Sequence, residues 1–90
     1  MKPIYKIQFI NEYTQEVIRA ATFDSPETIL HMIKGFEKTI NIDEDSYIFD
    51  SNQRAYIAEY LTHNKITEDN TITYNLFFKT RLSDIQIPLG

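Results

Sequence analysis

The chain of 90 residues contains no cysteine and no tryptophan, and it has only two glycines. Without cysteine the protein can form no disulfide, no thiolate metal site and no cysteine nucleophile. Small secreted domains usually depend on disulfides, so we expect a cytoplasmic protein. The two glycines, Gly35 and Gly90, stand far apart. A standard phosphate-binding loop needs glycines where the backbone approaches the ligand, so this pattern predicts no nucleotide-binding loop and no other cofactor.

Long apolar runs and a strong positive charge are also missing. No stretch approaches the roughly 18 apolar residues that indicate a membrane-spanning helix, and Lys6 and Gln8 interrupt the start of the chain, which excludes a signal peptide of ordinary type. The formal net charge is −4. Affinity for nucleic acid comes largely from Lys and Arg at phosphates, so this charge disfavours a nucleic-acid partner.

What the chain does have is ample material for a core. Hydrophobic residues make up 42% and aromatic residues 13% of the sequence, which is typical of a folded domain. The length predicts a single domain over residues 1–90. Fourteen isoleucines stand against one valine, a bias that indicates an AT-rich genome rather than a structural need. Such genomes are common among some bacteria and their phages.

Alternating apolar and polar residues predict strands over 3–11, 16–23, 46–50 and 71–80. Between the second and third of these, Ser25-Pro26-Glu27 is typical of a helix start, since Pro26 suits the first helical position. The helix should end near Thr39 to Asn41, and its core-facing stripe consists of Ile29, Ile33, Phe36 and Ile40. Gly35 lies inside this helix, where we expect it to allow close packing against the sheet.

Three segments are less regular. Residues 54–62 alternate as a strand would, although the four-residue spacing of Ile57 and Leu61 also fits a helix; we expect a strand. Residues 63–70 are polar and predict a loop. Residues 82–90 predict a tail or a short edge strand, because Pro88 cannot donate to a central ladder.

Together these elements predict an α+β fold. We expect a mostly antiparallel sheet of four to five strands in the order β-β-α-β-β-β, with one amphipathic helix packed on one face.

The residues that usually perform catalysis are isolated. His31 falls on the polar side of the predicted helix and His63 opens the predicted loop, and neither has a partner at ligand spacing. The acidic cluster that begins at Asp43 fails the calcium-loop pattern, because Ile48 stands where a glycine and Arg54 where a carboxylate is needed. We therefore predict no catalytic, cofactor-binding or metal-binding residues, no enzyme and no small-molecule substrate.

An excess of apolar residues gives the functional prediction. One helix covers one face of a sheet, yet several predicted strands carry apolar side chains on both faces. We expect a small non-catalytic protein that binds a protein partner through the face away from the helix, in the context of a phage or mobile element that modulates a host protein. The candidate interface residues are Tyr56, Tyr60, Phe77, Ile85 and Ile87.

Two alternative hypotheses for the function also fit the sequence. In the first, the protein is a homo-oligomer or assembly subunit whose alternating tail, with Ile85 and Ile87, pairs with the sheet edge of another chain. In the second, Lys65, Lys79 and Arg81 form a weak nucleic-acid-binding surface with the neighbouring aromatic residues.

Overall fold

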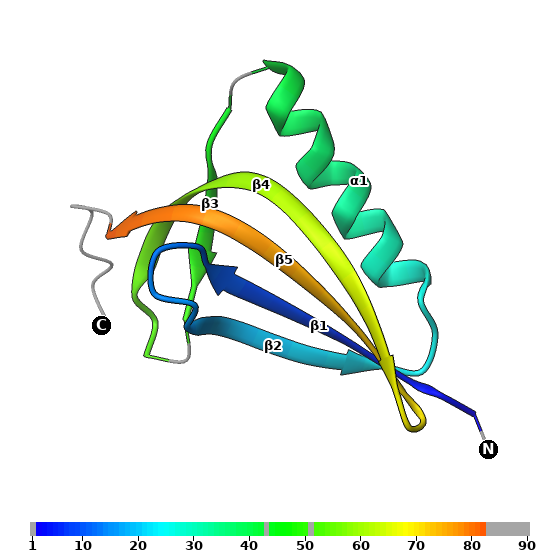
Figure 1. The fold of residues 1–90 in the computed structure, drawn as a ribbon. Coiled ribbons are helices and arrows are strands. Elements are labelled where there is room, and N and C mark those ends of the chain that lie inside the picture. The colour runs from blue at the N-terminus through cyan, green and yellow to red at the C-terminus, as the bar shows by residue number, and fades with distance from the viewer. Residues whose placement is uncertain (1, 43, 51, 83–90) are drawn as a thin grey trace.

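The computed structural model of the protein describes residues 2–42, 44–50 and 52–82, which form one helix and five strands (Figure 1). The elements are β1 (Ile4–Asn11), β2 (Val17–Phe23), α1 (Glu27–Ile42), β3 (Ser46–Phe49), β4 (Ala55–Glu68) and β5 (Thr71–Leu82). This order confirms the predicted α+β fold. Leu82, the first residue of the predicted tail, belongs to β5, and the rest of the tail, with Ile85 and Ile87, lies outside the described residues.

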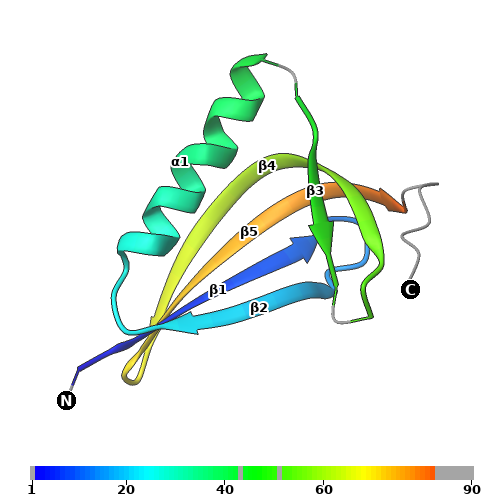
Figure 2. The ribbon, with the colours of Figure 1, turned by 180° about the vertical axis from the view of Figure 1, so that it is seen from behind.

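The five strands form a single sheet in the order β2-β1-β5-β4-β3. β1 and β5 lie side by side in the middle and are parallel, whereas the other three pairs are antiparallel. The sheet is therefore mostly antiparallel, as predicted. Figures 1 and 2 show the long strands β4 and β5 arching beneath α1, which runs along one side of the sheet only.

The helix begins at Glu27, one residue after the predicted first position, and ends one residue later than the predicted range. Pro26 contributes its carbonyl oxygen to the first turn, where it accepts a hydrogen bond from Leu30 N at 2.9 Å. Ile29 and Ile33 are buried against the sheet. The prediction for Gly35 is wrong, because this residue faces solvent and a Cβ built there meets no atom within 4 Å.

The segment after Arg54 is a strand, as expected, but it is longer than predicted. The prediction of a loop over residues 63–70 is wrong, because β4 continues to Glu68 and pairs with β5 through Thr62 to Glu68. Only Asp69 and Asn70 form the turn, and Asp69 takes a positive φ of 53°. Tight two-residue hairpin turns require such a conformation. Apart from Ile66, the side chains of this segment are polar, but backbone pairing with β5 decides its structure.

Aromatic rings fill the space between α1 and the sheet. Phe36 of the helix contacts Phe78 of β5, with ring centroids 5.1 Å apart, and it stacks on Tyr60 of β4 at 5.9 Å. Phe9 of β1 closes the cluster, with centroid distances of 5.8 Å to Phe36 and 5.7 Å to Phe78. Edge-to-face contacts of this kind add to the free energy gained by burying the rings.

In the described part of the chain, no helix lies over the other face of the sheet, and this face is more polar. Asn75 of β5 lies between Gln8 of β1 and Asn64 of β4 in one row across the sheet. Its Nδ2 donates to Asn64 Oδ1 at 3.0 Å. Asn75 is only 8% exposed, and its Oδ1 has no hydrogen-bond partner. We call this side of the sheet the uncovered face.

Candidate interaction surface

The described candidate interface residues do not lie together. Tyr60 is 4% exposed and belongs to the core beneath α1. Tyr56 points to the same side as Tyr60, and its hydroxyl donates to Asp50 Oδ2 at 3.4 Å. Phe77 lies on the uncovered face, where it is half-buried beside Ile10 of β1. Because side chains alternate along a strand, the buried Phe78 forces Phe77 to the opposite side. Of the three, only Phe77 faces away from the helix.

The three candidate cations are also divided between the two sides. Lys65 pairs with Tyr74 across the strands on the helix side, and its Nζ lies 6.0 Å from the centre of the tyrosine ring. Lys79 and Arg81 project from β5 on the uncovered face, and both are exposed. Single-strand binders line one groove with their cations and aromatic rings. The structure does not bring these three residues into one groove.

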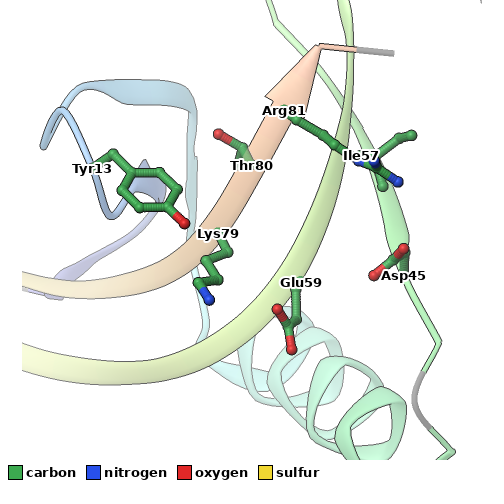
Figure 3. Close-up of a pocket in the computed structure, with 7 residues that line it drawn as sticks. All are labelled: Tyr13, Asp45, Ile57, Glu59, Lys79, Thr80 and Arg81. Atoms are coloured by element: carbon green, nitrogen blue, oxygen red, sulfur yellow. The ribbon is translucent and has the colours of Figure 1, made fainter. Parts of the chain in front are cut away.

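Lys79 and Arg81 instead line a groove of about 320 Å³ at the end of β5 (Figure 3). We call it the β5 groove, and its lining consists of Tyr13, Asp45, Ile57, Glu59, Lys79, Thr80 and Arg81. Figure 3 shows Tyr13 of the β1–β2 turn beside Lys79 of β5, and Arg81 of β5 directed toward Ile57 of β4. The groove therefore collects residues from distant parts of the sequence.

Tyr13 reaches the groove because the β1–β2 turn is held against β5. Glu12 N donates to Phe78 O at 2.9 Å, which extends the pairing of β1 with β5 into the turn. Within the turn, Asn11 Oδ1 accepts from Tyr13 N at 3.0 Å. A side-chain oxygen that bonds two residues ahead is a common way to fix a turn. The Tyr13 ring is 69% exposed at this position.

Two more exposed aromatic residues, Tyr47 and Phe49, lie on β3, the strand that follows the groove residue Asp45 in the chain. Tyr47 is 56% exposed and Phe49 is 39% exposed, whereas Ile48 between them is buried. Because Ile48 is buried on the helix side of the sheet, both aromatic rings project from the uncovered face. Tyr47 pairs with Ile57, which pairs in turn with Arg81, so one row joins the edge of the sheet to the groove.

The far end of β3 is held in place by its neighbours. Arg19 of β2 donates from Nη1 to Phe49 O at 3.2 Å, so the two outer strands of the sheet meet at this point. In the following turn, Asp50 Oδ1 accepts from Asn52 N and Arg54 N, each at 2.9 Å. These hydrogen bonds keep Phe49 at a defined position on the surface.

Sequence reasoning missed the β5 groove and the aromatic residues on β3. Alternation alone showed that Tyr47 and Phe49 oppose Ile48, which was a usable signal. It did not show which of these sides the helix covers. Tyr13 gave no signal, because a tyrosine in a turn is placed by the hydrogen bonds of that turn and by its neighbours in space.

The strongest electrostatic perturbation lies on the helix side, at Tyr60. Its hydroxyl is within hydrogen-bond distance of His63 Nδ1, at 2.7 Å. Burial raises the pKa of Tyr60 to about 12, and the nearby carboxylate of Glu37 adds to this rise. Both causes disfavour the phenolate. Tyr60 therefore stays protonated to a higher pH than an ordinary tyrosine, and its hydroxyl serves as a structural hydrogen-bonding group.

Within residues 2–42, 44–50 and 52–82, no group of three or more acidic or histidine side chains could hold a metal ion. In the same part of the chain, the helix is too short and too polar to cross a membrane. Comparison of the chain with protein-family models, with curated proteins and with solved structures found no match.

Proposed function

We propose that this chain is a non-catalytic binding protein that recognises another protein through the uncovered face of its sheet. The observation that carries this proposal is the exposure of Tyr13 in the lining of the β5 groove, with Tyr47 and Phe49 exposed on the same face of β3. Tyrosine, phenylalanine and arginine are enriched in protein interfaces, and Tyr and Arg are frequent among the residues that dominate binding energy.

The groove also suggests the chemistry of the partner. Lys79 and Arg81 offer positive charge on β5, and Asp45 and Glu59 offer negative charge beside them. Glu59 and Lys79 are direct neighbours across the strands, so they compensate each other in the free protein. A partner that fits this arrangement presents an apolar side chain surrounded by positively and negatively charged groups. A bacterial host protein is the partner class that the composition of the chain favours.

Affinity capture followed by cross-linking and mass spectrometry tests the proposal. The informative variant is Tyr47→Asp, and Leu30→Asp is its matched control. Leu30 lies on the outer side of α1 and is 44% exposed, close to the 56% of Tyr47. Both substitutions place one carboxylate at an exposed apolar position, but only the first alters the proposed interface.

We expect the wild-type protein and Leu30→Asp to capture the same partner, with cross-links to residues of the β5 groove. Tyr47→Asp should lose at least about tenfold in affinity, as expected for a central aromatic contact. Far-ultraviolet circular dichroism should be the same for all three proteins. Retention of the partner by Tyr47→Asp together with Arg81→Ala would show that the interface lies elsewhere.

A further inference from the structure

Among the described residues, the free edge segments of β2, β3 and β4 differ in their protection against pairing with another strand. β3 has four residues, and Arg19 occupies a carbonyl at its end. β4 is free beyond Ala58, where β3 pairing stops, but this segment contains a bulge after Tyr60 and the charged Lys65. Short length, bulges and lysine are the usual means by which proteins prevent edge pairing.

β2 has a bulge at Ile18 in its first half, but its second half lacks these means of protection. The strand has seven residues, and its one charged side chain, Arg19, is bonded to β3. Its second half, Ala20, Ala21 and Thr22, is small, uncharged and exposed. In Figures 1 and 2, β2 lies at the margin of the molecule. The β3–β4 turn approaches it as far as Ala20, which lines a pocket with Asp50 and Gln53.

The hydrogen bonds of β1 determine which backbone groups of β2 are free. Ile4 and Glu12 direct their N–H groups toward Asn70 O and Phe78 O on the β5 side. These directions alternate along a strand. The backbone N–H and C=O groups of the even-numbered residues of β1 therefore point toward β5, and those of the odd-numbered residues point toward β2. Asn11 agrees, since its N–H donates to Glu16 O at the start of β2.

The cross-strand register then assigns the groups of β2. Ile7 pairs with Ala21 and Tyr5 with Phe23, so Ala21 and Phe23 bond to β1. Ala20 and Thr22 lie opposite Gln8 and Lys6, whose backbone N–H and C=O groups point toward β5. The N–H and C=O groups of Ala20 and Thr22 therefore point outward from the edge of the sheet.

We propose that a second copy of this chain pairs antiparallel with β2, with the twofold axis at Ala21. Ala20 of each copy then exchanges two hydrogen bonds with Thr22 of the other, which gives four in total. Ala21 faces Ala21 of the second copy at the close spacing of about 4.5 Å between Cα atoms that a non-hydrogen-bonded pair adopts. An alanine at this position leaves the two strands free to approach.

The side chains of β2 favour a second copy in this register. Arg19 faces Phe23 of the second copy, so a cation lies beside an aromatic ring on each side of the axis. The acidic Glu16 and Asp24 near the ends of β2 do not face each other. In the neighbouring register, with the axis at Ala20, Glu16 would lie opposite Asp24, which like-charge repulsion disfavours. This dimer uses an edge distinct from the β5 groove.

Oxidative cross-linking tests the proposal directly, because the chain has no cysteine of its own. Ala21→Cys places two thiols opposite each other across the axis, at a Cα separation that suits a disulfide. Thr28→Cys, at an exposed position of α1, is the matched control. We expect Ala21→Cys to form a disulfide-linked dimer at least about tenfold faster than Thr28→Cys. Equal rates for the two variants would overturn the proposal.

Sedimentation of the protein without cysteine gives an independent test. We expect the wild type to approach twice its chain mass of 10.6 kDa as its concentration rises toward the millimolar range. Thr22→Pro removes an outward N–H and leaves pairing with β1 intact, so it should remain a monomer. Thr22→Ala keeps the N–H and should dimerise like the wild type. A wild type that stays monomeric overturns the proposal, even if the edge takes a strand from another protein.

Discussion

The two faces of the sheet differ in composition, although they are formed by the same strands. On the helix side, Phe9, Tyr60 and Phe78 surround Phe36 of α1, and Phe78 has no exposed surface. On the uncovered face, the same central strand presents Asn75, the half-buried Phe77 and the exposed Lys79. One helix of 16 residues covers only the first of these faces.

This difference shows where the stability of the protein and its proposed binding function reside. Burial of the aromatic cluster supplies the hydrophobic free energy of folding. The uncovered face contributes less to the free energy of folding, because its amide and charged groups replace hydrogen bonds to water with only a few contacts to the protein. It is therefore the face on which residues can be selected for a partner without loss of the fold.

The largest expected effect comes from two adjacent phenylalanines on opposite faces of β5. Phe78→Ala removes a ring with no exposure, so it should lower the free energy of unfolding by about 3–5 kcal/mol. Phe77→Ala removes a half-buried ring and should cost only about 1–2 kcal/mol. Urea denaturation followed by circular dichroism measures both. Equal losses would show that the two faces stabilise the fold alike.

A smaller effect should appear at high pH, through Tyr60. Its pKa is about 12 in the folded protein and the ordinary value for tyrosine is 10.0. Between these values the folded state holds a proton that the unfolded state has released. The stabilisation is therefore complete below pH 10 and is lost as the pH rises through about 12. Its size is about 1–2 kcal/mol, below the full linkage value because the exposed His63 lets solvent screen the hydroxyl.

The Tyr60 effect is measured as the midpoint of urea denaturation at about pH 9 and at about pH 11.5. The first lies below the ordinary tyrosine pKa and the second lies above it. Tyr60→Phe is the control, since it keeps the ring and the five other tyrosines. The wild type should lose more stability than Tyr60→Phe over this interval. The same loss in both proteins would contradict a raised pKa at Tyr60.

The smallest effect concerns the buried amide on the uncovered face. Asn75→Val removes the carbonyl oxygen that has no partner and introduces a side chain favoured in strands. Asn64, which loses its bond to Asn75, is exposed and can bond to water. We expect the free energy of unfolding to rise by about 0.5–1 kcal/mol in the same urea assay. A clear loss of stability would show that the Asn75 amide is fully bonded in solution.

Much of the fold was predictable from local sequence signals. Ser25-Pro26-Glu27 marked the helix start, the spacing of Ile29, Ile33 and Phe36 marked its inner face, and strict alternation marked β5. Residues 63–68 were not predictable in this way, because their polar side chains resemble a loop. Gly35 was misread for a related reason: the sequence gives its place in the helix but not what lies beside it.

The candidate site was less predictable than the fold. Phe77 was placed correctly on the face away from the helix, whereas Tyr56 and Tyr60 lie on the other side. Alternation within β4 showed that Tyr56 and Tyr60 share a face, but only the packing of α1 decides which face that is. The sequence likewise grouped Lys65 with Lys79 and Arg81, and the register of β4 against β5 separates them.

The sequence by itself determined the order of the elements, the buried stripe of the helix and the absence of cysteine chemistry, because these depend on neighbouring residues or on composition. The tertiary structure decided which face of the sheet is buried, how Tyr13 meets Arg81, and which backbone groups of β2 remain free. Each of these depends on contacts between residues far apart in the chain, formed by strand register and helix packing, which local patterns do not encode.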